Sequence, residues 1–310
     1  MPPTPTLHST HSEPTGRIGI DLGGTKTEVI ALTPDGQACF RERKPTPKED
    51  YGAILRGIVG LVREAEQTLT APAKVGLGMP GALSAATGRV KNANTTCLNG
   101  KPLQQDLAQA LGRDVRVEND ANCMTLSEAV DGAGADGRLV FGVILGTGVG
   151  GGLVLEREVW PGRNHIAGEW GHNPMPMATQ DDLPLPPCYC GRLGCIETYL
   201  CGPALERQYK AHTGQMVSGQ ALPGLAANND TVAVHLLRRY CDRLARSLAL
   251  VINVLDPDVI VLAGGLSNLP GLDTQVTARL PQYVFSDRVD TAVRIAQHGD
   301  SSGVRGAAWL

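Results

Sequence analysis

Two strand–turn–strand units of related design constrain the fold of this chain more than any other sequence feature. The first unit, residues 17–43, alternates apolar and small residues and turns at Gly23-Gly24. The second, residues 139–160, has an apolar strand, a turn at Gly146-Thr147-Gly148 and a returning strand. Alternation with glycine at the turns predicts antiparallel hairpins. The two units, alike in pattern more than in residue identity, indicate a weak internal duplication.

The rest of the chain alternates between helical and strand patterns. The predicted helices span 51–69, 102–112, 120–132, 230–254 and a short segment from 301, and the later predicted strands span 73–81, 115–119 and 258–265. Such alternation predicts an α/β protein. Because three strands precede the first helix, the first sheet should be mixed rather than purely parallel. A chain of 310 residues is also long enough to divide into two lobes.

Composition and charge exclude several classes of protein. The chain is 42% hydrophobic and 19% charged, as ordinary globular proteins are. A net charge of −3 gives no reason to expect nucleic acid or an anionic membrane as a partner. No apolar run approaches the ~20 residues that span a bilayer. Residues 1–16 are polar and proline-rich without signal-peptide features, so we expect a disordered leader and a cytoplasmic protein.

Three glycine turns are candidates for binding phosphate, because glycine lets backbone N–H groups approach an anion closely. The predicted phosphate-binding residues are Gly23, Gly24, Gly146, Gly148, Gly264 and Gly265, with hydroxyl donors from Thr25 and Thr147 and with Asp21 placed to hold water on Mg²⁺. Each turn alone is more simply a hairpin turn, and neither common nucleotide fingerprint is present. Together the turns predict a two-lobed nucleotide clamp.

Asp120 is the candidate catalytic base. It lies in V-E-N-D-A-N, where a helix should begin. A carboxylate at that position is also a good helix N-cap, which is the simpler interpretation of the residue alone. Phosphoryl transfer to a sugar hydroxyl requires an acceptor for the hydroxyl proton. An aspartate of ordinary pKa is ionised at neutral pH and can take this role.

Carboxylates and amides that accept hydrogen bonds from neighbouring hydroxyls are candidates for binding a sugar. They are Asn94, Asn119, Glu169 and Glu197, each of which could equally be a surface residue.

His172 and three crowded cysteines form a candidate metal site. Cys188, Cys190 and Cys195 have C-x-C-x₄-C spacing, and His172 lies a short distance before them. A Cys₃His set suits a structural tetrahedral zinc. No ligand position is open for catalysis, so the ion should serve as a staple between Glu169 and Glu197.

The chain resembles the ROK family (repressors, open reading frames and kinases), on its sugar-kinase side, from about Arg17 to the end. The motifs that carry the resemblance are I-D-L-G-G-T-K-T at 20–27, E-N-D-A-N at 118–122, L-G-T-G-V-G-G-G at 145–152, G-E-W-G-H at 168–172, C-Y-C-G-R-L-G-C-I-E at 188–197, L-D-P-D-V-I-V-L-A-G-G at 255–265 and H-G-D-S-S-G-V-R-G-A-A at 298–308. The resemblance implies the two-lobed, actin-like ATPase fold of hexokinases (ribonuclease H-like), with mixed sheets and with ATP and sugar in the cleft.

The resemblance also implies roles for individual residues. It makes Asp120 the base, adds Lys26 to the phosphate motif, and gives ATP with Mg²⁺ and a structural Zn²⁺ as cofactors. The implied sugar site consists of Gly81, Asn94, Asn119, Asp120, Glu169, His172 and Glu197, and the implied zinc ligands are His172, Cys188, Cys190 and Cys195. We expect a small lobe at 17–119 completed by about 297–310, a large lobe at 120–296 that holds the zinc segment 172–195, and a homodimer.

Within the family, the likeness is greatest to bacterial fructokinases that also accept mannose. V-K-N-A-N-T-T-C-L-N-G at 90–100 and G-E-W-G-H-N-P at 168–174 carry it, although Cys97 stands where some fructokinases have a bulkier residue. The leading prediction is transfer of the γ-phosphate of ATP to the 6-hydroxyl of fructose, with mannose or glucose as further substrates. The alternative is an N-acetylglucosamine kinase. A sugar-responsive repressor is disfavoured, because only 16 residues precede Arg17, too few for a DNA-binding module.

Overall fold

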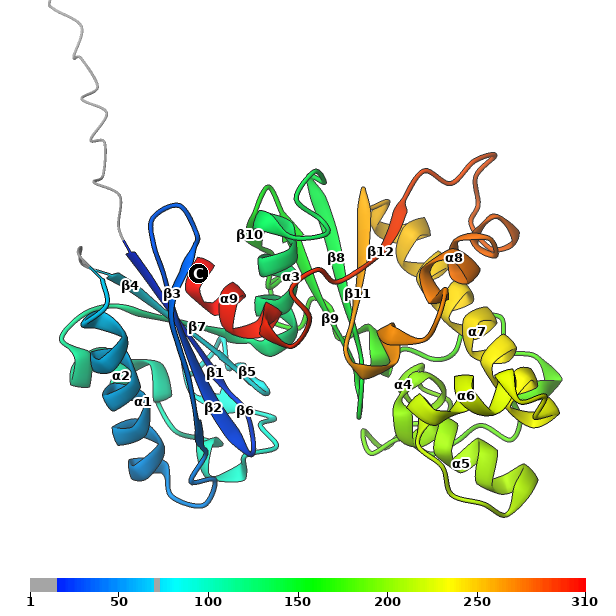
Figure 1. Cartoon of the computed structure of the whole chain (residues 1–310), viewed down its shortest axis with the longest axis horizontal. Coiled ribbons are helices and arrows are strands. Elements are labelled where there is room, and N and C mark those ends of the chain that lie inside the picture. The colour runs from blue at the N-terminus through cyan, green and yellow to red at the C-terminus, as the bar shows by residue number, and fades with distance from the viewer. Residues whose placement is uncertain (1–15, 70–72) are drawn as a thin grey trace, which may run out of the picture.

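The computed structural model describes residues 16–69 and 73–310. The predicted leader lies outside the described residues except for Gly16, which already belongs to strand β1 (Gly16–Leu22). The chain forms two five-stranded sheets, one from each half of the sequence, and these lie side by side with helices around them (Figure 1). This is the predicted α/β, two-lobed architecture.

The N-terminal sheet has the strand order β3-β2-β1-β4-β7. After β1 its strands are β2 (Lys26–Leu32), β3 (Ala38–Pro45), β4 (Ala73–Met79) and β7 (Val115–Asn119). The first three strands are antiparallel to one another, whereas β4 is parallel to β1 and β7 is parallel to β4. The sheet is mixed, as three strands before the first helix predicted.

The C-terminal sheet repeats this topology in the order β10-β9-β8-β11-β12. Its strands are β8 (Leu139–Leu145), β9 (Val149–Leu155), β10 (Glu158–Val159), β11 (Val259–Ala263) and β12 (Ala292–Ile295). Again each neighbouring pair among the first three strands is antiparallel, whereas β11 is parallel to β8 and β12 is parallel to β11. The weak duplication in the sequence is therefore a full duplication of sheet topology.

Each sheet has a hydrophobic core beneath its own set of helices. Helices α1 (Tyr51–Glu66) and α2 (Leu103–Leu111) pack on the N-terminal sheet. In the sequence between β4 and α2, β5 (Ala82–Leu83) and β6 (Val90–Lys91) form a small two-stranded sheet. The C-terminal sheet packs against the long α7 (Thr231–Leu255), with α4 (Glu197–Leu200), α5 (Gly202–Thr213), α6 (Leu222–Ala227) and α8 (Leu272–Thr277) around it. Burial of these apolar faces supplies most of the folding free energy.

Two further helices join the halves, and each packs on the sheet of the other half. Helix α3 (Asp120–Asp131) follows β7 but lies on β8 and β9, whereas α9 (Ser302–Trp309) follows β12 but lies on β1 and β4 (Figure 1). The two helices also touch each other, because an added Cβ at Gly306 would lie 1.6 Å from the carbonyl oxygen of Cys123. Glycine permits this backbone contact.

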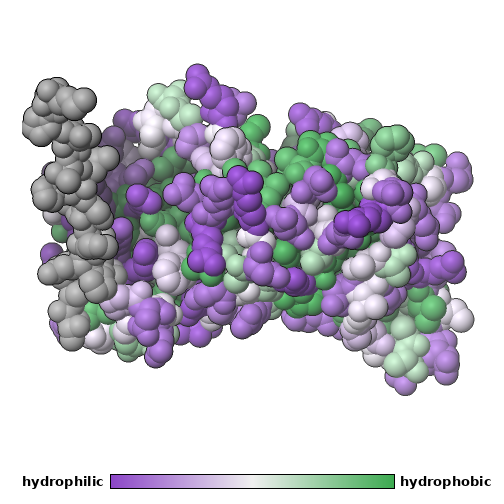
Figure 2. Space-filling view, turned by 90° about the horizontal axis from the view of Figure 1, so that it is seen from above, coloured by the Kyte–Doolittle hydropathy of each residue, from purple (hydrophilic) through white to green (hydrophobic). Residues whose placement is uncertain are grey.

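The predicted elements are present with ends shifted by up to three residues. The helix expected at 51–69 ends at Glu66, and the strand expected at 258–265 ends at Ala263. Helices α4, α6 and α8 were not predicted, because four to six residues are too few for a clear apolar period. The 12-residue α5 was also missed, because its sequence is mostly polar and buries only Ala204, Leu205 and Tyr209. No helix within 16–69 and 73–310 combines the length and apolar character needed to cross a bilayer. The face seen in Figure 2 is largely hydrophilic, with smaller hydrophobic areas between.

Candidate active site

A cleft of about 270 Å³ gathers residues from both halves of the chain. Among the predicted site residues it is lined by Asp21, Gly23, Gly24, Asn94, Asp120 and Gly264. They come from the end of β1 and its turn, the segment after β6, the start of α3 and the end of β11. The structure therefore brings the first phosphate turn, the candidate base and the last glycine turn to one cavity.

The start of α3 positions Asp120. Asn119, and not Asp120, is the N-cap: its side-chain oxygen accepts a hydrogen bond from Ala121 N–H at 2.9 Å. Asp120 is the first helical residue, and its Oδ1 accepts from the same N–H at 2.9 Å. Its Oδ2 makes no hydrogen bond within the described residues, and Asp120 is one of the residues that line the cleft. Burial, with a further contribution from the Glu169 carboxylate, raises the pKa of Asp120.

Asp21 lies opposite Asp120 in the same cleft, at the end of β1. Burial and then the negative charge of Asp120 raise the pKa of Asp21 to about 6. A carboxylate whose ionisation is disfavoured by a second carboxylate suits a site that receives a cation. The donor set, which is all oxygen, fits Mg²⁺.

A second cavity of about 390 Å³ adjoins the cleft at the third glycine turn, since Gly264 lines the first and Gly265 the second. Gly146 and Thr147 of the second turn also line it, so it collects the remaining predicted nucleotide-binding residues of the second half except Gly148. Sequence reasoning assigned no role to the other lining residues, Gly202, Pro203, Glu206, Ser218, Gly219, Gln220 and Leu266. All but Leu266, which directly follows the third glycine turn, lie on α5 and the segment before α6, where no motif marks them.

Of the predicted sugar-binding residues, only Asn94 and Asp120 line the cleft, whereas Gly81, Asn119, Glu169, His172 and Glu197 line neither cavity. Glu197 begins α4, and its Oε2 accepts a hydrogen bond from Val149 N–H at 3.0 Å, which ties it to the second glycine turn. Glu169 is exposed but close enough to Asp120 to raise its pKa. Asn94 is exposed beside Gly24.

Asn119 and Gly81 are joined to each other. The Asn119 side-chain amide donates to the Gly81 carbonyl at 2.9 Å, and its oxygen caps α3. In this arrangement both polar ends of the Asn119 side chain already have a protein partner. The two residues hold the strand β4 and the start of α3 together.

Several predicted residues line neither cavity. Thr25 and Lys26 are exposed at the outer side of the first turn, and Gly148 lies against the Glu197 carboxylate, 2.7 Å from where a Cβ would sit. Lys26 still contributes charge to the site, because it opposes the rise in the pKa of Asp21.

The four predicted metal ligands come together within one loop region. Their ligand atoms all lie within 4.8 Å of one another. The Cys190 and Cys195 sulfurs are 3.6 Å apart, and Cys188 Sγ is 3.5 Å from Nδ1 of His172. A tetrahedral zinc with bonds of about 2.3 Å to sulfur and about 2.0 Å to nitrogen requires separations of about 3.8 and about 3.6 Å. The residues fit a zinc ion, and Nδ1 is the histidine atom turned toward it.

The opposite nitrogen of His172 points away from the cysteines. Nε2 lies 3.0 Å from the hydroxyl of Tyr189, and the two rings meet edge to face with centroids 5.1 Å apart. His172 can therefore bind a metal through one nitrogen while the other hydrogen-bonds elsewhere.

The segment before α9 supplies cleft residues that sequence reasoning left without a role. Gly299, Asp300, Ser302 and Gly303 line the cleft, together with Pro80, Met124 and Ile144. The H-G-D-S-S-G motif at 298–303 was noted only as part of a family resemblance. Its place in the cleft depends on how α9 crosses to the N-terminal sheet.

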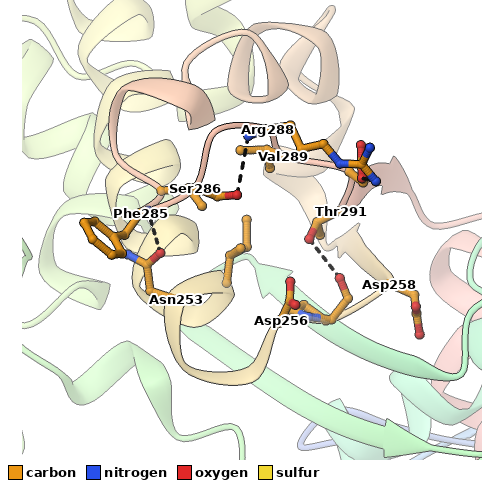
Figure 3. A pocket seen from close by; sticks show the side chains of 12 residues that line it. Asn253, Asp256, Asp258, Phe285, Ser286, Arg288, Val289 and Thr291 are labelled. Carbon is orange, nitrogen blue, oxygen red and sulfur yellow. Dashed lines mark hydrogen bonds and ion pairs between the residues drawn. The ribbon is translucent and has the colours of Figure 1, made fainter.

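A third cavity, about 740 Å³ and larger than the two described above, lies away from all these residues. It is an open groove between the end of α7 and the loop 284–291 (Figure 3). Its polar groups are engaged locally: Asn253 accepts from Phe285 N–H at 2.9 Å, and Thr291 donates to the Pro257 carbonyl at 2.8 Å. It brings together no set of convergent catalytic groups.

Comparison with known proteins identifies the family. A profile of the ROK family matches residues 17–310. The chain belongs to the ROK family. Curated relatives within it include N-acetyl-D-glucosamine kinases from Shigella flexneri serotype 5b (strain 8401) and from Escherichia coli (strain K12 / DH10B), each 40% identical over 94% of this chain and 98% of the relative. This ROK protein is a sugar kinase, as its sequence predicted.

Solved structures of ROK proteins support the same fold. The ROK hexokinase from Thermus thermophilus matches with a TM-score of 0.84 and 30% identity, covering 95% of this chain and 97% of the other. The ROK family glucokinase from Streptomyces griseus, solved with glucose and AMPPNP, matches with a TM-score of 0.74 and 27% identity, covering 94% and 98%. The prediction of the two-lobed hexokinase-type fold is confirmed.

Proposed function

We propose that this ROK sugar kinase transfers the γ-phosphate of ATP to the 6-hydroxyl of N-acetylglucosamine. The observation that carries the reaction is the cleft in which Asp120 faces Asp21 and the first glycine turn. The choice of sugar rests on the names of relatives that are 40% identical over nearly their whole length. The leading prediction of fructose is not confirmed, and the relatives favour what was the alternative.

Asp120 is proposed to accept the proton of the sugar hydroxyl. Its Oδ1 is held by Ala121 N–H, so Oδ2 is the oxygen that can approach the hydroxyl. Burial and the Glu169 charge raise its pKa, which strengthens it as a base provided that it stays ionised at neutral pH. The α3 N-terminus, which favours negative charge, supports that ionised form.

Asp21 is proposed to hold, directly or through water, the Mg²⁺ that accompanies ATP. The ion would neutralise charge on the phosphates. Gly23 and Gly24 would bind phosphate oxygens through backbone N–H groups. Gly146, Thr147 and Gly265 line the adjoining cavity, which we assign to the rest of the nucleotide.

A structural zinc is proposed on His172, Cys188, Cys190 and Cys195. It would fix the loop between Glu169 and Glu197, so both carboxylates would approach the sugar from a rigid support. The Nε2 of His172, which faces away from the cysteines, would contact the sugar or Tyr189.

We further propose that the lobes are 17–119 with about 297–310 and 120–296. The packing of α9 on β1 and β4, and of α3 on β8 and β9, supports these bounds. The homodimer expected from the family stays a prediction, to be checked by light scattering.

A sugar panel tests the proposed function. ADP release is measured with N-acetylglucosamine, fructose, mannose, glucose and N-acetylmannosamine, and the product is located by NMR. We expect the highest kcat/KM for N-acetylglucosamine and phosphate on its 6-oxygen. Preference for fructose would restore the motif-based prediction from residues 90–100, and turnover of none of these sugars would contradict the proposal.

A further inference from the structure

Glu128 is a buried carboxylate that the mechanism above does not use. It lies in the last turns of α3, the helix whose first residue is Asp120, and its side chain has no solvent exposure. Buried glutamates are rare unless their charge is compensated. No lysine or arginine pairs with Glu128 among the described residues, so its partners must be hydrogen-bond donors.

Four donors bind the carboxylate, two at each oxygen. Oε1 accepts from His298 N–H at 2.9 Å and from the Ser302 hydroxyl at 2.7 Å. Oε2 accepts from Ala133 N–H and from Gln297 N–H, each at 2.9 Å. Burial opposes ionisation of Glu128, but these donors outweigh it and lower the pKa of the carboxyl. Glu128 is therefore ionised at neutral pH.

Three of these donors belong to segment 297–302, which leads from β12 into α9. The same segment and the first turn of α9 line the cleft through Gly299, Asp300, Ser302 and Gly303. Gly303 faces Asp21 so closely that an added Cβ would lie 3.5 Å from its carboxylate oxygen. The position of this cleft wall is thus set by the backbone contacts of Gln297 and His298 with Glu128.

We propose that Glu128 is a positioning residue. It lies on α3, the helix that carries the base Asp120, and accepts hydrogen bonds from the cleft wall 297–303, so it fixes that wall relative to the base. This inference rests on the proposed function, because it concerns the alignment of Asp120 with the phosphate side of the cleft. The sugar-side residues Glu169 and Glu197 lie on other segments. Loss of Glu128 should therefore disturb phosphoryl transfer and nucleotide binding while leaving sugar binding intact.

Glu128→Gln tests the proposal, because the amide keeps the shape but turns an NH₂ group toward two of the four donors. Since a buried donor left unpaired is costly, kcat should fall on the order of 10- to 100-fold and KM for MgATP should rise. The Kd for N-acetylglucosamine, measured by calorimetry without nucleotide, should stay within about 2-fold. Hydrogen exchange at Gln297 and His298 should accelerate.

Asp131→Asn is the matched control. Asp131 lies one turn further along α3 and contacts the same C-terminal region, but only through the side chains of His298 and Arg305. We expect its kcat to stay within about 2-fold of wild type, because the substitution leaves the four donors on Glu128 in place. An equal loss of kcat in Asp131→Asn would overturn the proposal. It would mean that any weakening of the contact between α3 and the C-terminal region lowers kcat, with no specific role for Glu128.

Other outcomes are equally decisive. Unchanged kcat in Glu128→Gln, or loss of sugar binding in parallel with kcat, would overturn the positioning role. If Glu128→Gln does not fold, Ser302→Ala removes one donor and should lower kcat in the same direction by a smaller factor, whereas unchanged kcat there would count against the proposal. If the wild type phosphorylates no sugar, the proposed function fails, and hydrogen exchange with binding of a non-hydrolysable MgATP analogue still tests the coupling.

Discussion

The two halves of the molecule share a scaffold but not its chemistry. Their sheets have the same strand order and directions, and Gly19 of β1 corresponds to Gly142 of β8. Both glycines admit a helix from the other half: an added Cβ would lie 2.1 Å from the Val304 carbonyl oxygen at Gly19 and 1.9 Å from Thr125 Oγ1 at Gly142. Packing thus requires the same residue at the same place in both sheets.

Two residues further along each strand the halves differ. Asp21 in the first half occupies the position of Ile144 in the second, and both line the cleft. The connections differ as well. Within the described part of the connection between β3 and β4 the one helix is α1, whereas the segment between β10 and β11 holds the predicted metal ligands and α4, α5, α6 and α7. Asp21 and the predicted metal ligands therefore lie where the duplication is not repeated, whereas the candidate phosphate turns occur in both halves.

The largest expected effect concerns the two helices that join the halves. Their first residues differ, since α3 begins with the carboxylate Asp120 and α9 with the hydroxyl Ser302, and the proposed base is on α3. Asp120→Asn should lower kcat on the order of 10²- to 10⁴-fold, since the proton acceptor is lost. Sugar binding, measured by calorimetry, should change little. Asp131→Asn, at the other end of α3, serves as the control. Wild-type kcat in Asp120→Asn would refute the assignment of the base.

The glycine contacts can be broken one half at a time. Gly19→Ala should destabilise the protein by about 3 kcal/mol, because its Cβ meets backbone atoms that cannot move away. Gly142→Ala should cost less, about 1–2 kcal/mol, since its added Cβ meets side-chain atoms of Thr125 and Met124 rather than backbone. Urea unfolding measures both free energies.

Gly57→Ala is the control for these substitutions. Gly57 lies within α1, and nothing is found within 4 Å of its added Cβ. Alanine there should stabilise the protein by about 0.5–1 kcal/mol. Equal losses of unfolding free energy at Gly19 and Gly142 would show that the atoms facing the two added Cβ atoms move aside equally easily, which would contradict the expected difference.

Asp21→Asn makes the first half more like the second. The folded-state pKa of Asp21, about 6, lies above its ordinary 3.8, so the ligand-free protein loses stability as pH rises between these values. Near pH 7.5 the variant should therefore be about 3 kcal/mol more stable than wild type, and this difference in stability should narrow by about half near pH 5. Its kcat should nevertheless fall.

Thermal unfolding of the ligand-free protein at both pH values measures this effect. Glu158→Gln, an exposed carboxylate in β10, is the control and should show no pH-dependent gap. If Asp21→Asn were less stable than wild type at neutral pH, that result would contradict the unfavourable burial and charge repulsion assigned to ionised Asp21.

The smallest expected effect concerns the long connection of the second half. Cys195→Ser should remove the proposed zinc and raise KM for the sugar about 10-fold, with KM for ATP within about 2-fold. Metal content and a tetrahedral Co²⁺ spectrum report the site itself. Cys39→Ser, an exposed cysteine in the first half, should keep both the metal and the kinetics. An unchanged metal content in Cys195→Ser would remove Cys195 from the ligand set.

Much of the site could be predicted from sequence because its signals are local. Turn glycines, the C-x-C-x₄-C spacing and the start of a helix at Asp120 are each set by a few neighbouring residues. The structure brings together the four metal ligands and places Asp21, Gly23 and Asp120 in one cleft. The bounds of the long α7 also agree with its apolar period to within one residue.

Other features could not be read from local pattern. Asn119 and Asp120 are both good caps, and only the backbone path decides that Asn119 takes the role. Glu206 and Gln220 line the second cavity because of how α5 and the segment before α6 pack against the glycine turns. Sequence reasoning gave neither residue a function, since both side chains are common on exposed helices and loops.

By itself, the sequence determined the two hairpins, the helices α1, α2, α3, α7 and α9, and the residue types that chemistry would need. Only the tertiary structure decided that α3 and α9 exchange sheets and that Glu128 connects the helix of the base to a distant segment, 297–302. The physical reason is range. Hydrogen-bonded turns and apolar periods act over a few residues, whereas the partner of a buried face or a buried carboxylate is chosen by packing among all segments of the chain.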